Sequence, residues 1–255
     1  LWTNSSRYKA GMFCADLNNT PYNNSDDKHK FIGPSFTNQD GATETINDIF
    51  AFEFDKNGEM WLGTDRGIFV LRNPKEFLSS DNVIFERVKI PRNDGTNLAD
   101  YLLSGVYTTA ICIDDANRKW VGTQNNGIFL LSEDGKETIH HFTSDNSPLP
   151  SNYIQSIAIN SSTGSVFIGT SLGLVEYASD ATEPENSLYE SNIKVYPNPV
   201  NPEFDGPVTI NGMSDKCTVR IVSSSGSFVY QEYSKGGTFT WNLNDRNGNR
   251  VSCGI

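Results

Sequence analysis

Three stretches of this chain repeat one pattern of residues. They run over residues 49–71, 110–131 and 157–177. Each reads as an apolar strand, a polar turn, an aromatic and an aliphatic residue followed by Gly-Thr, a short polar turn, a glycine and a second apolar strand. A supersecondary unit used several times at such a spacing predicts a β-propeller. In that fold, function lies on loops and surfaces rather than in a buried reaction centre.

The first copy shows how the residues specify one blade. Residues 46–54 predict an inner strand, and Asp55 to Gly58 predict a tight turn, because glycine permits a positive φ and aspartate bonds its own backbone. A returning strand is expected at 59–64 and a third strand at 68–71. Alternation over 83–90 predicts a fourth, edge-like strand.

The other blades follow from the same landmarks. We expect the second blade at about 106–142 and the third at about 154–178, with residues 91–103 as an insertion between the first and the second. Residues 1–4 and 11–17 resemble the back half of an earlier blade. About three and a half four-stranded blades are therefore predicted. Rings usually need four to eight blades, so the chain is expected to hold part of a larger propeller. Its first residue is not Met and it ends in an apolar run, so we expect it to be a fragment.

The pattern changes after the third blade. We place the propeller at 1–180, a polar linker at 181–191 and a second domain at 192–255. The second domain contains short alternating runs, which predict a small Ig-like β-sandwich truncated at its last strand. These runs are 193–196, 208–210, 218–222, 227–231 and 237–242. The predicted fold class is thus all-β: a partial propeller followed by a sandwich.

Composition and charge limit the classes of function. The net charge is −11, and all of the excess lies in residues 1–185, which carry 25 acidic and 14 basic side chains. Nucleic-acid binding needs clustered Lys and Arg, so we expect no nucleic-acid partner. With 36% hydrophobic residues and no apolar run near the roughly 20 residues that cross a bilayer, no transmembrane segment is predicted.

The four cysteines do not form a metal motif. Cys14, Cys112, Cys217 and Cys253 contain no Cys-x-x-Cys pair, so we expect no zinc site. Cys112 lies in an apolar strand and is interpreted as a core residue. Cys217 and Cys253 share the second domain; whether they form a disulfide is left open, since the sequence does not give their separation.

Two polar loops could be considered as calcium sites. Asp55 to Gly58 is one, but the third repeat has Asn160 to Gly164 at the same place, with no acid, so a turn is the better interpretation. Asn244 to Asn249 offers few oxygens and no distal glutamate. We therefore predict no metal-binding residues and no cofactor.

The residues that could support catalysis do not assemble into a known constellation. His29, His140 and His141 belong to no metal or hydrolase motif, and the two adjacent histidines should point to opposite faces of a strand. The Asp55 hairpin is similar to the sialidase Asp-box, but its Asp-to-Gly spacing differs and neither an arginine cluster nor a tyrosine nucleophile can be identified. We predict no catalytic residues and no enzyme.

Tryptophans could suggest a ligand-stacking surface. Trp61 and Trp120 occupy equivalent repeat positions, where the third copy has Phe167. Equivalence under the repeat predicts that these rings pack between blades. Trp2 and Trp241 lie outside this pattern.

The repeat resembles the two-component regulator propeller repeat of Bacteroidetes sensors over residues 46–71, 106–131 and 154–177. The second domain, with Tyr196-Pro-Asn-Pro199 and Trp241-Asn-Leu-Asn-Asp-Arg-Asn-Gly248, resembles the C-terminal sorting domain of the type IX (Por) secretion system. A propeller followed by such a domain is similar to the PorZ family of Bacteroidetes.

The resemblance implies a non-enzymatic scaffold or adaptor of the type IX attachment complex on the outer face of the outer membrane, with a periplasmic location as the alternative. It implies other proteins of that complex as partners, with lipopolysaccharide or another glycan as a further candidate. No ligand residue transfers from it. The alternative function is the extracytoplasmic, glycan-sensing propeller of a hybrid two-component regulator. The sequence leaves open the blade number, the partner surface and the oligomeric state.

Overall fold

The structure is a computed structural model of the 255-residue chain, and it describes residues 1–5, 9–20, 22–92, 94–186 and 192–252. The regular secondary structure of the described residues consists of β-strands and one short 3-10 helix, η1, at Pro74–Glu76. The chain divides into two compact units. The first holds Leu1–Ile113, Asn117–Ala158 and Phe167–Glu176, and the second holds the remaining residues up to Ile255. None of the described helices has the length and apolar character that a membrane crossing requires.

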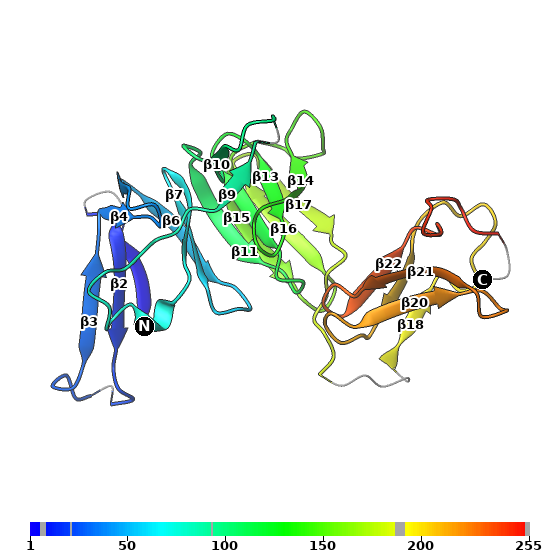
Figure 1. Cartoon of the computed structure of the whole chain (residues 1–255), viewed down its shortest axis with the longest axis horizontal. Helices are drawn as coiled ribbons and strands as arrows, with labels where there is room; N and C mark the ends of the chain where they lie inside the picture. The colour runs from blue at the N-terminus through cyan, green and yellow to red at the C-terminus, as the bar shows by residue number, and fades with distance from the viewer. Residues whose placement is uncertain (6–8, 21, 93, 187–191, 253–255) are drawn as a thin grey trace. The chain divides into compact units, whose positions relative to one another are not determined.

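The first sheet of the propeller is a three-stranded antiparallel sheet (Figure 1). It consists of β1 (Trp2–Ser5), β2 (Gly11–Asp16) and β3 (Lys28–Ile32). Met12 and Cys14 of β2 are buried in one core with Met60 and Leu62 of the following blade. The partial blade expected at the start of the chain is therefore present, and Cys14 belongs to its core.

The first complete repeat forms β6 (Ile49–Phe54), β7 (Met60–Thr64) and β8 (Gly67–Leu71) in that order. The fourth strand predicted at 83–90 is wrong. That segment pairs with β8 only through an isolated bridge between Val70 and Glu86. Phe85 and Val88, which lie three residues apart, are 0% and 4% exposed, so the apolar residues of this irregular segment fill the core rather than one face of a ladder.

The second repeat confirms the predicted four-stranded blade, whereas the third repeat has three strands. The second is a four-stranded sheet of β11 (Thr108–Ile113), β12 (Lys119–Thr123), β13 (Ile128–Leu131) and β14 (Thr138–Phe142). The third has three strands, β15 (Ile154–Asn160), β16 (Ser165–Thr170) and β17 (Gly173–Ala178). Only the second blade therefore has four strands among the described residues.

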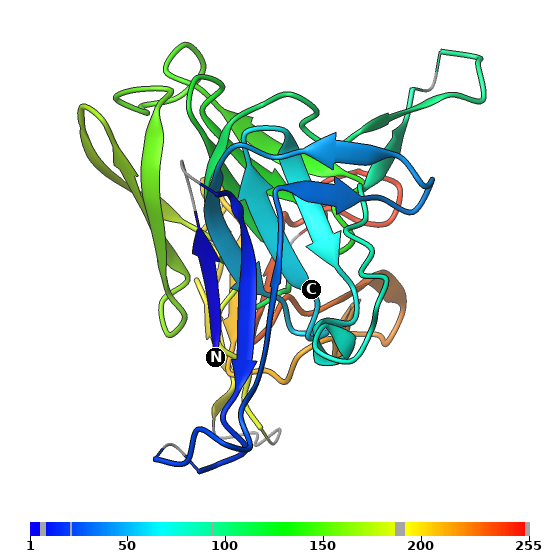
Figure 2. The same cartoon turned by 90° about the vertical axis from the view of Figure 1, so that its left-hand side faces the viewer.

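Two hairpins connect the blades. β4 (Ser35–Thr37) pairs with β5 (Thr43–Thr45), and β9 (Lys89–Pro91) pairs with β10 (Ala99–Tyr101). The β9–β10 hairpin holds most of the insertion expected at 91–103, and Figure 2 shows it projecting from the rest of the first unit.

The repeated Gly-Thr positions set the spacing between blades. A Cβ on Gly63 would lie 2.7 Å from the carbonyl oxygen of Thr108, and one on Gly122 would lie 2.5 Å from Cγ2 of Ile154. Glycine at these positions lets the first strand of the next blade approach the sheet closely. Trp61, fully buried, packs with Ile111 of the second blade, which confirms the predicted inter-blade role of this ring.

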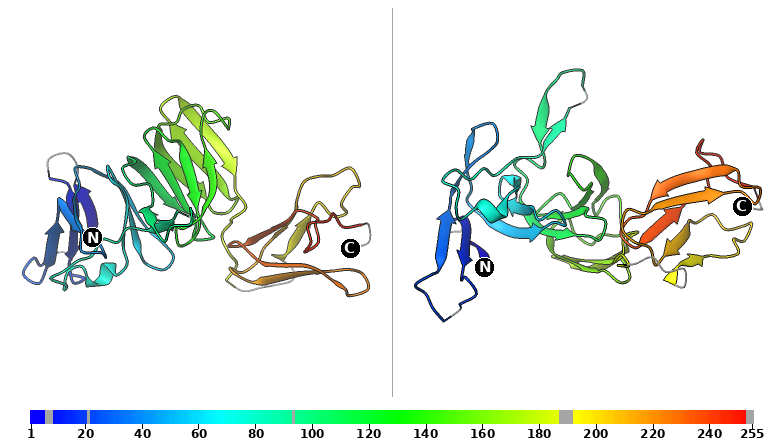
Figure 3. Two further views of the ribbon diagram at one scale, coloured as in Figure 1. Left: turned by 45° about the horizontal axis from the view of Figure 1, so that its top comes forward. Right: turned by 60° about the horizontal axis from the view of Figure 1, so that its bottom comes forward.

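The second unit contains two small antiparallel sheets (Figure 3). One is β18 (Lys194–Tyr196), β19 (Val208–Asn211) and β22 (Thr238–Trp241); the other is β20 (Thr218–Val222) and β21 (Phe228–Tyr233). Both sheets contribute to one core, which includes Val208, Val229, Phe239 and Trp241. All five strands lie close to their predicted positions. Cys217 packs against this core, whereas Cys253 lies outside the described residues.

Candidate functional site

The turn at Asp55 is held by its own aspartate. Oδ1 of Asp55 accepts the backbone N–H groups of Asn57 at 2.9 Å and Glu59 at 3.0 Å, and Gly58 adopts φ 79°. This is an aspartate-capped turn, as predicted, with both donors supplied by the backbone. Asp245 repeats it, accepting from the amides of Asn247 and Asn249. Within the described ranges, no group of three or more His, Cys, Asp or Glu side chains is arranged to hold a metal ion.

The second carboxylate oxygen of Asp55 bonds across the blade boundary. Nζ of Lys119, on β12, donates to Oδ2 of Asp55 at 3.0 Å, and both side chains are fully withdrawn from solvent. Nζ also donates to the backbone carbonyl oxygens of Asn117 at 2.8 Å and Glu133 at 2.5 Å. All three ammonium protons therefore have acceptors, which is what a buried charge requires.

The ring of Trp61 closes this arrangement. Its Nε1 donates to Oδ2 of Asp55 at 3.3 Å, and Nζ of Lys119 lies 4.8 Å from the ring centroid. Burial alone would raise the pKa of Asp55, but hydrogen bonds from Lys119 and the turn amides hold it below its ordinary value. Burial lowers the pKa of Lys119, against the opposing effect of Asp55. The ion pair of Asp55 and Lys119 links the first blade to the second, and its hydrogen-bonding groups find their partners within the interface between these blades.

The repeat pattern did not lead us to predict this ion pair, although the sequence carries a signal for it. Lys119 occupies the repeat position held by Met60 in the first blade and Val166 in the third, and all three are fully buried. A lysine where the other copies carry apolar residues indicates a buried charge with a dedicated partner.

A second buried charge lies beneath the two hairpins. Nη1 of Arg87 donates to both carboxylate oxygens of Glu44 at 2.8 Å, and Nη2 donates to the carbonyl oxygen of Arg66 at 3.0 Å. The guanidinium carbon lies 4.5 Å from the ring centroid of Phe69 and 4.9 Å from that of Tyr101. Arg87 thus fixes the β4–β5 hairpin against the β8 strand.

An exposed network continues from this arginine to the β9–β10 hairpin. The hydroxyl of Tyr101 donates to Oδ2 of Asp40, and Nζ of Lys89 donates to its Oδ1, both at 2.7 Å. Hydrogen bonds from Lys89 and from Tyr101 lower the pKa of Asp40. These contacts join the turn of the β4–β5 hairpin, where Asp40 lies, to the base of the β9–β10 hairpin, so the network positions loops rather than presenting a reactive group.

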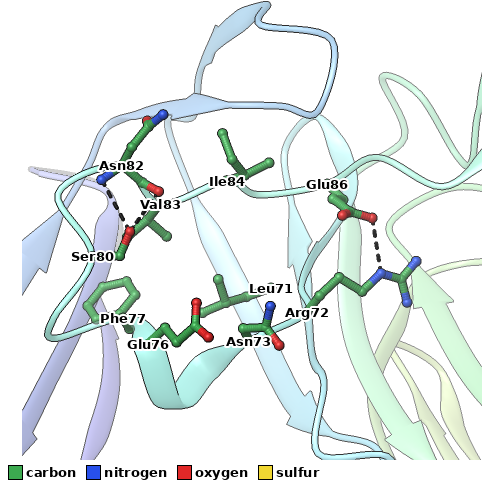
Figure 4. A pocket seen from close by; sticks show the side chains of 10 residues that line it. All are labelled: Leu71, Arg72, Asn73, Glu76, Phe77, Ser80, Asn82, Val83, Ile84 and Glu86. Atoms are coloured by element: carbon green, nitrogen blue, oxygen red, sulfur yellow. Dashed lines mark hydrogen bonds and ion pairs between the residues drawn. The ribbon is translucent and has the colours of Figure 1, made fainter.

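One pocket opens beside η1, and Figure 4 shows its lining side chains. Its volume is about 160 Å³, below the roughly 300–1,000 Å³ of ordinary small-molecule sites. Figure 4 shows the side chain of Arg72 extending to Glu86, at 3.1 Å between Nε and Oε2. Arg72 also bonds Glu59, so its charge is committed to two glutamates. The lining residues are Leu71, Arg72, Asn73, Glu76, Phe77, Ser80, Asn82, Val83, Ile84 and Glu86.

The histidines lie apart from this pocket. His141 stacks on Phe129 with ring centroids 3.9 Å apart, and its Nε2 lies 2.7 Å from the carbonyl oxygen of Asn126. His140 stacks on Phe142, two residues along β14, so the adjacent histidines point to opposite faces as predicted. His29 stacks on Phe13 of the first sheet. The structure does not bring the three histidines together.

The remaining tryptophans also serve packing. Trp2 lies edge-on to Phe77 with centroids 4.8 Å apart. Trp241 is buried in the second unit, and its Nε1 donates to the carbonyl oxygen of Asn244 at 2.8 Å. Trp2 packs against the core of the first sheet and the first repeat, and Trp241 belongs to the core of the second unit.

Comparison with known proteins agrees with this architecture. The family model described as "Two component regulator propeller" matches residues 43–66, which span β6, β7 and the turn into β8. None of the curated protein sequences matches the chain.

The chain is similar to a solved structure of PorZ from Porphyromonas gingivalis, with 36% identity and a TM-score of 0.70. The match covers 99% of this chain and 33% of PorZ, so the chain spans about a third of the length of that structure. PorZ is described as an essential bacterial surface component of the type IX secretion system.

A second solved structure is the extracellular domain of the hybrid two-component protein BT3049 from B. thetaiotaomicron. It has 19% identity and a TM-score of 0.46, and the match covers 94% of this chain and 32% of that one. Sheet order, repeat and similarity lead to one conclusion: this chain is an all-β propeller protein that carries the two-component regulator propeller repeat and resembles PorZ.

Proposed function

We propose that this chain is part of a non-enzymatic scaffold or adaptor of a type IX secretion system, acting at the cell surface. The observation that carries the proposal is the 36% identity to PorZ over 99% of the chain. A match at this identity that covers both units rather than one repeat supports a shared role more strongly than the propeller fold alone.

The polar chemistry of the molecule supports a scaffold. Two of its buried basic side chains, Lys119 and Arg87, are paired with Asp55 and Glu44 across structural elements. Its pocket of about 160 Å³ is smaller than a usual substrate site. Function would then reside in surfaces, such as the projecting β9–β10 hairpin. We assign no catalytic, cofactor-binding or metal-binding residue.

The proposal includes a domain organisation for the chain. Residues 1–180 would be blades of a larger propeller, 181–191 the linker and 192–255 an Ig-like, sorting-type domain. Partners would be other proteins of the attachment complex at the outer membrane, and lipopolysaccharide or another glycan is the further candidate. The acidic excess of residues 1–185 favours protein partners over anionic glycans for the propeller.

Deleting the gene in a bacterium that encodes it together with a type IX system tests the proposal. We expect secreted cargo to be missing from the cell surface and to return when the gene is restored. Normal display of cargo on the surface of the deletion strain would overturn the proposed scaffold role.

The second candidate, a glycan-sensing propeller, is favoured by the family model at residues 43–66. It predicts that the deletion strain loses a transcriptional response to a polysaccharide and keeps normal cargo display. Measuring both properties in one strain separates the two functions.

A further inference from the structure

The two-stranded sheet of the second unit has one face in the core and one face open to solvent. Its strands, β20 and β21, lie side by side (Figure 1). Val219 and Ile221 of β20 pack on the core together with Val229 and Tyr230 of β21. Because side chains alternate along a strand, the residues between them lie on the opposite face. We call this opposite face the β20–β21 outer face, and its six residues are all exposed: Thr218, Arg220, Val222, Phe228, Gln231 and Tyr233.

The strand register joins these six side chains into one continuous surface. Residues that face one another across an antiparallel pair lie close enough for their side chains to interact. The register shifts between Ile221 and Val222, and this irregularity sets Phe228 opposite Val222, so two apolar side chains lie together at one end of the face. The three facing pairs are Thr218 with Tyr233, Arg220 with Gln231, and Val222 with Phe228.

The composition of this face is that of a protein interface. Tyr233 is 62% exposed, Phe228 46% and Val222 44%, and exposed apolar groups gathered in this way mark an interaction site. The face contains tyrosine, phenylalanine and arginine, which are enriched at the centre of protein interfaces, and it contains no Asp, Glu or Lys, which are depleted there. A protein partner therefore fits it better than a glycan, whose many hydroxyl groups need hydrogen-bonding partners.

Arg220 is the only charged residue of the face and lies in its middle pair. Its Nε donates to Oε1 of Gln231 at 2.9 Å, and its guanidinium carbon lies 6.0 Å from the ring centroid of Phe228. Within the described residues this side chain makes no other hydrogen bond, so Nη1 and Nη2 can donate to a group from outside. A carboxylate suits them, because it accepts two parallel N–H bonds from a guanidinium.

We propose that the β20–β21 outer face docks a protein surface that presents an Asp or Glu carboxylate to Arg220, with apolar side chains on either side of that carboxylate. The carboxylate accepts from Nη1 and Nη2 of Arg220. The flanking apolar side chains cover Tyr233 at one end of the face and Val222 with Phe228 at the other. One positive charge with no acid beside it provides the charge complementarity. The proposal concerns the second unit alone and does not depend on the secretion role.

Site-specific photocrosslinking in cells tests the proposal on the whole protein. A photoreactive phenylalanine derivative replaces Thr218, and in a separate strain it replaces Glu203, an exposed residue between β18 and β19. Mass spectrometry identifies what is captured. We expect the Thr218 position to crosslink to a protein peptide in which an Asp or Glu lies among apolar residues, and the Glu203 position to give no such product.

Substitutions of arginine separate docking from folding. Arg220→Gln keeps a polar side chain but loses the charge, so we expect the crosslink yield to fall roughly tenfold while the thermal unfolding midpoint stays unchanged. Arg246→Gln removes an exposed arginine elsewhere in the second unit and is the matched control, which should keep the full yield. Arg220→Glu combined with an arginine in place of the captured carboxylate should restore the yield.

Four results would overturn the proposal. The first is capture of lipid or glycan alone from the Thr218 position, or of nothing. The second is an equal product from the Glu203 position. The third is an undiminished yield in Arg220→Gln, or an equal loss in Arg246→Gln. The fourth is a failure of the reversed charge pair to restore the yield.

Discussion

Lys119 of the second blade donates a hydrogen bond of 3.0 Å to Asp55 of the first, and both side chains are withdrawn from solvent. Asp55 lies in the turn before β7 of the first blade, and Lys119 is the first residue of β12, the equivalent strand of the second blade. Asp55 completes its own turn with one oxygen and anchors the neighbouring blade with the other. A turn residue thus also sets the packing of two sheets.

Removing the carboxylate of Asp55 should strongly destabilise the first unit. Asp55→Ala leaves the ammonium of Lys119 buried without its counter-charge, which costs about 3–5 kcal/mol. The loss of stability can be measured by urea unfolding, monitored by tryptophan fluorescence, in a Trp241→Phe background. In that background the three remaining tryptophans all lie in the first unit. Lys136→Ala, which breaks the exposed ion pair with Asp134, is the control and should hardly move the midpoint. Equal effects of the two variants would contradict this role for Asp55.

Acid should remove the contribution of Asp55. Its pKa is depressed in the folded state, so the unfolded state binds the proton more readily, and the stabilisation is fully present above the unfolded pKa of about 3.9. It is lost as the pH falls through the lower, folded pKa. The difference in unfolding free energy between the wild type and Asp55→Ala should therefore be constant from about pH 6 to pH 5 and shrink below about pH 4. A difference in unfolding free energy that stayed constant down to about pH 2 would show that folding does not lower the pKa of the Asp55 carboxyl group.

Arg87 should not be replaceable by lysine. Its guanidinium contacts both oxygens of Glu44 and the carbonyl oxygen of Arg66, and lysine cannot reproduce this planar fork. Arg87→Lys is expected to cost about 1.5–3 kcal/mol, the usual range for hydrogen bonds to charged groups. Arg92→Lys, on the exposed hairpin, is the matched control and should leave the unfolding midpoint unchanged. Hydrogen exchange at the amides of the β4–β5 hairpin should rise only in Arg87→Lys; an unchanged exchange rate would argue against the anchoring role.

The three repeat glycines should differ in their tolerance of alanine. Gly63→Ala and Gly122→Ala force a Cβ into the first strand of the next blade and should each cost about 1–3 kcal/mol. Gly169→Ala meets only the rotatable hydroxyl of Ser156, so it should change the stability of the 255-residue chain by no more than about 0.5 kcal/mol. Thermal unfolding of the three variants would check this order. Equal destabilisation would mean that the glycines serve backbone conformation rather than blade spacing.

Much of the fold follows from the sequence because its determinants are local. The turns at Asp55 and Asp245 are fixed by hydrogen bonds between residues two and four apart, so their residues identify them. The repeated Gly-Thr landmarks place β7, β12 and β16, and the alternating runs place all five strands of the second unit.

The tertiary structure determined two features that the local sequence pattern does not contain: the conformation of residues 83–90 and the partners of the buried charges. Residues 83–90 alternate like a strand, but only Lys89 and Ile90 join a ladder, in the β9–β10 hairpin. Phe85 and Val88 are buried outside any strand, because apolar residues fill a core whether or not their backbone pairs. Lys119 and Asp55 are 64 residues apart and Arg87 and Glu44 are 43 apart. The sequence by itself determined which residues form turns, strands and apolar faces. The packing of sheets on one another determined which groups pair with the buried charges, because a charge withdrawn from water is stable only beside a group that folding brings to it.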